Sequence, residues 1–434
     1  LPWFRRSASF HRLFLGGFFP GIYLSMPRRH FVAMLLAITL IVMLAPQARA
    51  EGDVRHVRVI WHERPATEAV ISWTSDHDKG DFIVRFGPAS ASGKLSQYPN
   101  EIKAGKSGRF AITRADEKET YKNLSFHHAS LTGLKPSTRY YFTVIDRGHA
   151  SKEYSFITAP ADEREVSIFH GGDSRGDGDA RREVAAMVAD MMSKDESIIA
   201  LAHGGDYVGS GDRMEHWINA MDDLELYATK DNRLLPIIPA RGNHHRGALF
   251  SHVFSYPAGK RDSYFTTQLA PGIALITLNT EMSTAGDQRL WLEKELARVR
   301  GENRWVVAQY HRPAWPAVKK PGSALKDFVP LFEEYGVDLV LEADGHVIKR
   351  TPPIKAGKVD PKGVVYLGEG GLGVAQRRPD TSRWYLKEPG MAASGHHVVK
   401  VTFSRDTITS QFILLDGQRV LDESKIKVRM EYSK

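Results

Sequence analysis

The chain has 434 residues, of which 42% are hydrophobic and none is cysteine; this allows two or three domains and excludes disulfides, thiolate metal sites and cysteine nucleophiles. The formal net charge is +8, but residues 1–50 contain six arginines and no acidic residue, so the rest of the chain is close to neutral. We therefore expect no nucleic acid among the partners.

The first 50 residues have the composition of an export signal. Two adjacent arginines precede the apolar run Phe31–Ala45, and Ala48-Arg49-Ala50 has the small-residue pattern of a cleavage site. The apolar run is too short for a stable membrane span. Met26 is the expected initiator, and we predict a mature protein that begins at Glu51 and is periplasmic or secreted. The sequence leaves open whether export uses a twin-arginine or an ordinary secretory signal.

Residues 51–158 have the pattern of an all-β sandwich. The run "LTGLKPSTRYYFTV" at 131–144 resembles fibronectin type III domains, with Tyr140 as the tyrosine corner and Trp73 as the core tryptophan. His127-His128 is predicted to be a solvated pair. Turn-forming residues separate the short apolar runs, and strands are expected at Val54–Trp61, Ala69–Trp73, Phe82–Phe86, Tyr140–Ile145 and Tyr154–Thr158.

A linker is expected at residues 158–165, and the periodicity changes after it. Residues 159–434 alternate apolar runs with amphipathic helical stretches, which favours an α/β domain whose functional loops follow the carboxyl ends of strands. Strands are expected at Val166–Phe169, Ile198–Ala202, Leu235–Pro239, Ile273–Leu278, Trp305–Gln309, Val337–Leu341 and Val364–Leu367. Helices are expected at Arg181–Met192, Arg213–Ala228, Asp287–Val299 and Leu325–Tyr335.

Polar residues follow five of these strands. Any one of them has an ordinary structural interpretation, such as a helix cap or a surface histidine, but five strand ends of the same kind predict a shared site. Oxygen and imidazole ligands without thiolate suit Zn, Fe or Mn. The candidates are Asp173 in "HGGDSRGDGD", Asp206 in "HGGDYVGSGD", Asn243 and His244 in "ARGNHHRG", His311 in "YHRPAW" and His346 in "EADGHVIKRT".

The order GD, GD, GNH, H and GH resembles the calcineurin-like metallophosphoesterase superfamily. With a fibronectin-type domain in front, the chain resembles purple acid phosphatases, and "YLGEGG" at 366–371 and residues 395–423 resemble that family's C-terminal strands. The resemblance implies that the second domain consists of two packed β-sheets flanked by helices.

The same resemblance implies a set of metal ligands. Asp206 matches the aspartate that bridges two metals, and Asn243, His311 and His346 match the other ligands of one metal. Asp173 matches an aspartate ligand of the second metal. One ion is therefore expected, and the binding of a second is left open.

Three positions depart from the family pattern. The position of the metal-binding tyrosine is Gly209, that of the second histidine of GHxH is Ile348, and the acid after GNH is replaced by His245. Tyr207 is adjacent to Asp206 instead. Because the family's purple colour arises from a tyrosinate bound to ferric iron, we expect this protein to lack that absorption band.

The expected function is hydrolysis of a small phosphate monoester by a metal-bound hydroxide that attacks phosphorus. His244 is expected to steady the phosphoryl charge or to protonate the leaving oxygen. Arg175, Arg246 and Arg312 adjoin the motifs and are candidates for holding phosphate oxygens. The alternatives are a phosphodiesterase and a non-catalytic phosphate-binding protein.

Arg175 has a second expected role. Its guanidinium could stand where the second metal would lie, because the carboxylates of Asp173 and Asp206 would otherwise repel each other. In the alternative, a weakly held second metal binds the two aspartates, water and a histidine such as His170 or His203.

Overall fold

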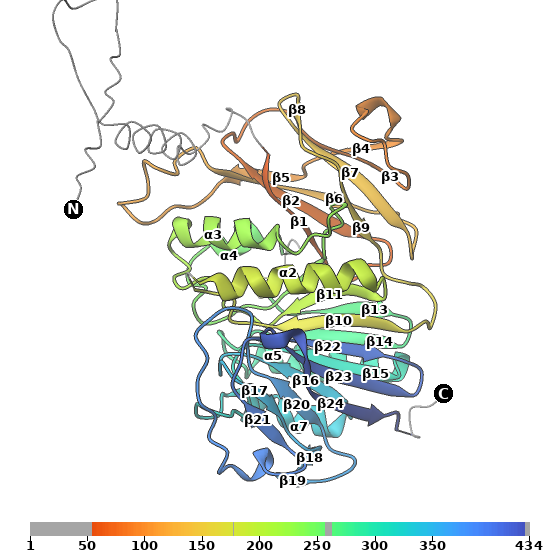
Figure 1. Cartoon of the computed structure of the whole chain (residues 1–434), viewed down its shortest axis with the longest axis vertical. Coiled ribbons are helices and arrows are strands. Elements are labelled where there is room, and N and C mark those ends of the chain that lie inside the picture. Colours follow the sequence, from red (N-terminus) through yellow and green to blue (C-terminus); the bar gives the residue numbers. More distant parts are fainter. Residues whose placement is uncertain (1–53, 177, 257–262, 430–434) are drawn as a thin grey trace, which may run out of the picture. The chain divides into compact units, whose positions relative to one another are not determined.

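The computed structural model describes residues 54–176, 178–256 and 263–429. The expected leader and its cleavage site lie outside these residues. The described residues belong to one folded unit, coloured from red to blue in Figure 1. Within them, no helix has the length and apolar character needed to cross a bilayer.

Residues 55–157 form the predicted β-sandwich. Trp73 is fully buried in its core, and the Lys135 amide donates a 2.9 Å hydrogen bond to the Tyr140 hydroxyl, which confirms the tyrosine corner. One layer is a sheet of β3 (Phe82–Gly87), β4 (Asn100–Lys103), β7 (Arg139–Asp146), β8 (His149–Ala150) and β9 (Tyr154–Ile157). The other contains β1 (Arg55–Ile60), β2 (Ala69–Ser75), β5 (Lys106–Arg109) and β6 (Ser125–Leu131).

The prediction of a solvated pair at His127-His128 is wrong. Both side chains are buried because β6 is an inner strand, paired with β2 on one side and β5 on the other. His127 stacks on Trp73 and lies 3.0 Å from the hydroxyl of Ser75, and His128 lies 2.7 Å from the hydroxyl of Ser72. Burial lowers the pKa of His127 to about 4, so the neutral ring packs in the core and hydrogen-bonds to serine.

The α/β part is built on two sheets. The first is ten-stranded, in the order β24-β23-β22-β10-β11-β12-β1-β2-β6-β5, and the second is seven-stranded, in the order β13-β14-β15-β16-β20-β17-β21. The first adds β10 (Val166–Gly171), β11 (Ile198–His203), β12 (Ile237–Pro239), β22 (His397–Phe403), β23 (Thr407–Leu414) and β24 (Val420–Lys427). The second contains β13 (Phe265–Ala270), β14 (Ile273–Thr277), β15 (Trp305–Gln309), β16 (Leu339–Glu342), β17 (Ile348–Arg350), β20 (Val365–Gly368) and β21 (Met391–Ala393).

The two sheets pack face to face between two layers of helices. Successive residues of a strand therefore point alternately to the other sheet and to the helices. Ile168 of β10 packs with Val307 of β15 in the core between the sheets, whereas the next residue, Phe169, packs with helix α2. Val306 faces the helices on the far side of the second sheet. Figure 1 shows α2 alongside β11, with α3 next to α2. The fold of packed sheets flanked by helices is therefore confirmed.

The helices are α2 (Asp179–Lys194), α3 (Met214–Leu224), α4 (Leu249–Val253), α5 (Asp287–Glu302), α6 (Ala324–Asp327) and α7 (Val329–Glu334). A two-stranded sheet of β18 (Ile354–Lys355) and β19 (Lys358–Val359), and the 3₁₀ turns η1 (Leu95–Gln97), η2 (Trp384–Leu386) and η3 (Asp416–Gln418), complete the elements. The single helix expected at Leu325–Tyr335 is two short helices. Pro330 lies in the first turn of α7, where its missing amide is tolerated, but it would interrupt a longer helix.

The sandwich and the α/β part share a sheet. Strand β1 pairs in parallel with β12, with Ile60 opposite Ile237, so the ten-stranded sheet continues from one sequence segment into the other. The expected domain boundary between residues 158 and 159 stays a prediction.

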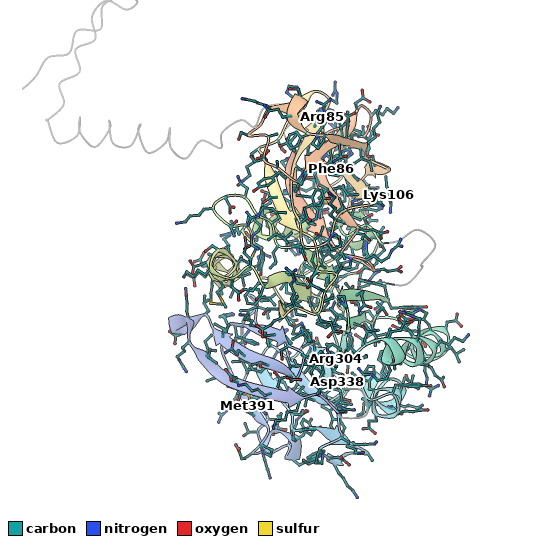
Figure 2. All side chains as sticks on the ribbon, turned by 90° about the vertical axis from the view of Figure 1, so that its right-hand side faces the viewer. Arg85, Phe86, Lys106, Arg304, Asp338 and Met391 are labelled. Carbon is teal, nitrogen blue, oxygen red and sulfur yellow. The ribbon has the colours of Figure 1, made fainter. Side chains whose placement is uncertain are left out.

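In the second sheet, buried Asp338 (Figure 2) accepts hydrogen bonds from the Arg300 side chain and the Val306 amide and so links α5 to the sheet.

Candidate metal centre

The parallel strands bring the candidate residues together. In the first sheet, β10, β11 and β12 are neighbours in register, so the loops at their carboxyl ends begin side by side. In the second sheet, β15 and β16 do the same. These loops carry Asp173, Asp206, Asn243 and His244 from the first sheet, and His311, Asp344 and His346 from the second.

Four residues of these loops have left-handed backbone conformations. The φ values are 55° at Asp173, 56° at Asp206, 68° at Asp344 and 60° at His346. Such conformations cost roughly 1 kcal/mol each for residues with a Cβ and cluster at functional sites. Here the reversal of the chain directly after a strand turns each side chain back towards the others.

Two glycines allow the loops to approach the carboxylates. A Cβ on Gly242 would lie 2.3 Å from an oxygen of Asp206, and a Cβ on Gly370 would lie 2.1 Å from an oxygen of Asp173. No side chain fits at either position without displacing a carboxylate. The loops after β12 and β20 therefore require glycine where they border the site.

The side chains of Asp173, Asp206, His311 and Asp344 form a buried group whose ligand atoms all lie within 4.8 Å of one another. Among the described residues, Asp173 Oδ1 and Asp206 Oδ2 accept no hydrogen bond, although both are buried. Burial would raise the pKa of Asp206, but His311 and the His244 amide outweigh it and hold that pKa well below its usual range. Buried carboxylate oxygens that accept no hydrogen bond need a cation nearby, which fits a metal ion.

His311 is oriented as a ligand. Its Nδ1 lies 2.9 Å from the carbonyl oxygen of Gly204 and must donate to it. The other ring nitrogen, Nε2, faces the site and lies 3.1 Å from Asn243 Oδ1, 3.3 Å from Asp206 Oδ2 and 3.5 Å from Asp344 Oδ1. A backbone acceptor that fixes the tautomer of a histidine is the usual support for a metal ligand. The predicted ligands Asp206, Asn243 and His311 therefore converge.

Asp344 is the residue that sequence reasoning missed. It belongs to the buried group, and it forms an ion pair with Lys319. His346 is not part of this group but contacts it, with Nε2 3.2 Å from Asp173 Oδ1. The signal was present in "EADGH", because a carboxylate two residues after a parallel strand is as well placed as the histidine that follows it.

His244 lies at the mouth of the site. Its backbone amide donates to Asp206 Oδ1 at 3.0 Å, and its Nδ1 donates to the carbonyl oxygen of Gly209 at 2.6 Å. Nε2 therefore faces the site, 3.7 Å from Asp206 Oδ2, and the side chain is 29% exposed. A proton on this atom can reach a bound ligand.

The three departures from the family pattern have structural counterparts. Ile348 is fully buried in the core between the sheets. The ring of Tyr207 stacks on His203 at 3.6 Å within the apolar cluster beneath α3, and burial raises the pKa of Tyr207 well above its ordinary value. His245 is buried, and its ring nitrogens each lie 2.9 Å from a backbone nitrogen, of Tyr207 and of Gly242. His245 therefore braces the loops instead of contacting the ring of His244.

The three predicted phosphate-binding arginines differ in their surroundings. Arg175 lies in the site, with Nε 3.4 Å from Asp206 Oδ2. Arg246 is exposed on the loop after β12. Nε of Arg312 donates to both carboxylate oxygens of Glu281, at 2.9 and 3.1 Å, so its charge is already paired. Arg175 is therefore the best placed of the three.

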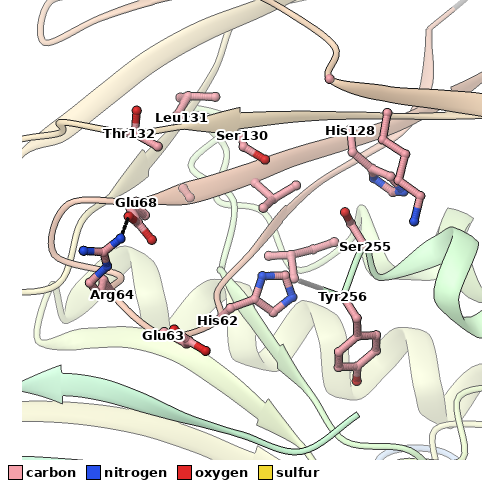
Figure 3. Close-up of a pocket in the computed structure, with 15 residues that line it drawn as sticks. His62, Glu63, Arg64, Glu68, His128, Ser130, Leu131, Thr132, Ser255 and Tyr256 are labelled. Atoms are coloured by element: carbon pink, nitrogen blue, oxygen red, sulfur yellow. Dashed lines mark ion pairs between the residues drawn. The ribbon is translucent and has the colours of Figure 1, made fainter. Parts of the chain in front are cut away.

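A separate pocket lies on the sandwich and contains none of these residues. Its volume is about 490 Å³, and its walls include Arg64, Glu68, Lys106 and His128 (Figure 3). Arg64 and Glu68 pair with each other across one turn of chain. The buried group of candidate metal ligands lies at the strand ends, outside this pocket.

Comparisons with known proteins agree with this geometry. Residues 54–158 match the model of the purple acid phosphatase N-terminal domain, and residues 169–348 match that of the calcineurin-like phosphoesterases. The chain is a purple acid phosphatase-like member of the calcineurin-like phosphoesterases. Its family resemblance and fold class are thus confirmed.

Similar proteins include plant members of this family. Purple acid phosphatase 15 of Arabidopsis thaliana is 24% identical over 58% of this chain and 54% of its own length, and purple acid phosphatase 23 is 23% identical over 70% and 77%. The chain thus spans about half the length of the first of these relatives. The structure of purple acid phosphatase PPD1 from yellow lupin (Lupinus luteus) seeds superimposes with a TM-score of 0.72 at 18% identity, over 88% of this chain and 76% of that one.

The family implies a metal centre, and the donor set fits an ion. Carboxylate, amide and imidazole donors converge, with unsatisfied carboxylate oxygens between them. This chemistry suits Zn, Fe or Mn rather than a soft metal that prefers thiolate.

Proposed function

We propose that this protein is an exported, metal-dependent phosphoesterase that hydrolyses phosphate monoesters. The observation that carries the proposal is the buried group of Asp173, Asp206, His311 and Asp344, with two carboxylate oxygens that accept no hydrogen bond from the described residues. Perturbed, unsatisfied acids at converging strand ends are typical of a reaction centre rather than of a structural ion pair.

Four side chains would hold the metal: Asp206, His311, Asn243 and Asp344. A bound ion would supply Lewis acidity to the phosphoryl group and to water. The chain itself orients this set before any ligand arrives, because Gly204 fixes the His311 ring and the His244 amide fixes the Asp206 carboxylate. Such preorganisation lowers the cost of binding a transition state.

His244 would handle the proton of the leaving group. Since Nδ1 donates to Gly209, the proton that can be exchanged is on Nε2, which faces the site and is reached by solvent. Protonated, Nε2 would donate to the leaving oxygen of an ester; neutral, it would accept a proton from water. Substitution by glutamine keeps a hydrogen-bonding side chain but cannot deliver a proton.

The test is hydrolysis of an aryl phosphate monoester and of the matching diester by the purified protein, with and without a metal chelator. We expect faster turnover of the monoester, its loss after chelation, and its recovery with Zn, Fe or Mn. His244→Gln should lower kcat by roughly 100-fold or more. His149→Gln is the matched control, because His149 is an exposed histidine of β8.

The other outcomes are equally specific. Faster hydrolysis of the diester would show that the protein is a phosphodiesterase and not a monoesterase. Binding of inorganic phosphate without turnover of either ester would indicate a phosphate-binding protein and would contradict the proposal.

A further inference from the structure

We infer that this centre holds a single metal ion and that the guanidinium of Arg175 takes the position of a second cation beside Asp206. The inference rests on the proposed function, and it concerns the composition of the site.

Arg175 is held in the site by its own loop. It follows Asp173 by two residues, and its amide donates to the carbonyl oxygen of Asp206 at 3.1 Å. From there the side chain places Nε 3.4 Å from Asp206 Oδ2 and Nη2 3.3 Å from Nε2 of His346. It is 19% exposed, so the guanidinium lines the site rather than extending into solvent. Its positive charge faces one of the two unsatisfied carboxylate oxygens.

The residues around Asp173 do not fit a second ion. One Asp173 oxygen accepts the Asp344 amide at 2.7 Å, so a single oxygen remains. Position 209 has no side chain, and Ile348 is buried in the core. His346 has its Nε2 between Asp173 and Arg175.

The two histidines that could have completed a second site are engaged elsewhere. Nδ1 of His170 lies 2.9 Å from the carbonyl oxygen of Ala202, and its Nε2 lies 3.2 Å from that of Glu342. Nε2 of His203 lies 2.9 Å from the hydroxyl of Ser174, and its Nδ1 accepts the Gly205 amide. Both rings support the loops, so neither is available as a ligand.

The charges of the site also favour one ion. Asp173, Asp206 and Asp344 supply three negative charges. Arg175 and Lys319, which pair with Asp206 and Asp344, supply two positive charges. One divalent ion then leaves the centre slightly positive, as a phosphate dianion requires. A second divalent ion would lie against the Arg175 guanidinium and be repelled by it. The guanidinium also has donors beyond those near Asp206 and His346, and its planar fork matches phosphoryl oxygens.

The first experiment measures metal content and needs no activity. Protein loaded with excess Zn and dialysed should contain one ion per chain by elemental analysis. Two tightly held ions per chain would overturn the inference while leaving the proposed function intact. One ion without hydrolysis of either ester would overturn the proposed function while leaving the inference intact.

The second experiment measures binding of inorganic phosphate to the zinc-loaded protein by calorimetry. Arg175→Gln should weaken binding roughly 10-fold, and Arg175→Lys should recover part of the loss because it keeps the charge. Arg289→Gln is the control, since Arg289 pairs with Glu293 on the exposed face of α5. Equal phosphate affinity in Arg175→Gln and the unsubstituted protein would overturn the inference.

A third measurement separates charge from local folding. In chelator, Arg175→Gln should lower the melting temperature more than it does in zinc-loaded protein, because Asp206 then has neither the metal ion nor the guanidinium beside it. A loss of equal size in both conditions would indicate a merely structural role and would overturn the inference.

Discussion

Asp344 and His311 show how one backbone angle and one hydrogen bond orient side chains of the centre. His311 is aimed by one hydrogen bond to Gly204, and Asp344 is aimed by a left-handed φ of 68° directly after β16. Both side chains end within reach of Asp206, and each has a partner on its other side, a carbonyl for His311 and Lys319 for Asp344. Substitution of His311 and of Asp344 should therefore affect metal binding to different extents.

Removal of the imidazole should abolish metal retention. His311→Ala deletes a ligand whose orientation the backbone already fixes, so both bound metal and turnover should fall by at least about 100-fold. Metal content after dialysis and aryl phosphate turnover are measured together. If His311→Ala retains both, the site is wrongly placed.

Asp344→Asn should weaken metal binding more mildly, by roughly 10-fold, because the amide oxygen remains but the charge is lost. Competition with a chromogenic chelator gives the affinity. Asp287→Asn, at the exposed start of α5, is the matched control. An unchanged affinity in Asp344→Asn would exclude Asp344 from the ligand set.

Iron-loaded protein should lack a purple band. Tyr207 is the tyrosine nearest to Asp206 in sequence, but its ring is stacked on His203 and burial holds its pKa far above the ordinary value, so no tyrosinate forms. A visible absorption spectrum of ferric protein tests this. A strong band in the green region would show that a tyrosine reaches the metal.

At the residue scale, the sequence predicted that Asp173, Asp206, Asn243 and His311 lie together, because polar residues after apolar runs mark parallel strand ends, and the structure brings these four side chains close to one another. It named His346 and passed over Asp344, although both follow β16 and both have left-handed backbone conformations; only Asp344 joins the buried group. It also took His127-His128 for surface residues, because one sequence gives no sign that β6 is an inner strand.

At the element scale, a buried polar network ties the loops of the second sheet. Nζ of Lys349, on β17, forms ion pairs with Glu342 at the end of β16 and with Glu369 after β20, and all three side chains are fully buried. Glu369 also accepts the Ala317 amide, and its carbonyl accepts the His346 amide. Two carboxylates on one ammonium leave an excess negative charge, and burial raises the pKa of Glu369 to about 7.

This raised pKa predicts a pH dependence of stability. Glu369 retains its proton in the folded chain up to about pH 7 but releases it near 4.5 when unfolded. Its stabilising contribution is therefore present below about pH 4.5 and lost as pH rises towards 7, at up to about 1.4 kcal/mol per pH unit. The melting temperature of Glu369→Gln relative to the unsubstituted protein should thus rise between about pH 5 and 7. A pH-independent difference would contradict the assignment.

The sequence predicted most elements that have a strong apolar run. Each expected strand is present with its ends shifted by two residues or fewer. Short or polar strands such as β4, β5 and β8 were missed, because they are defined by pairing with neighbours rather than by their own composition. The break between α6 and α7 depends on Pro330, whose effect on a helix depends on where the helix begins.

At the scale of the whole molecule, the sandwich is joined to the phosphoesterase part by a common sheet. Besides the β1–β12 pairing, the Val57 amide donates to Glu225 at 2.9 Å, and Glu117 accepts the amide of Met214 at the start of α3 at 2.8 Å. Pairing between segments so far apart in sequence cannot be inferred from local periodicity. It makes the sandwich a structural support of the loops rather than a tethered module.

Export is the prediction that belongs to the whole chain. Because Ala48-Arg49-Ala50 follows a short apolar run, the mature protein should begin at Glu51. N-terminal sequencing of periplasmic or secreted material gives the answer. Retention of the leader on most molecules would refute the assignment.

The central claim is that the strand ends of the two sheets converge on a metal. An anomalous difference map from crystals of the zinc-loaded protein, collected at the zinc absorption edge, tests it most directly. We predict a single strong peak, roughly 2.0–2.2 Å from Asp206 Oδ2 and His311 Nε2. A map with no peak between Asp206, His311 and Asp344, or with zinc bound only elsewhere on the molecule, would contradict it.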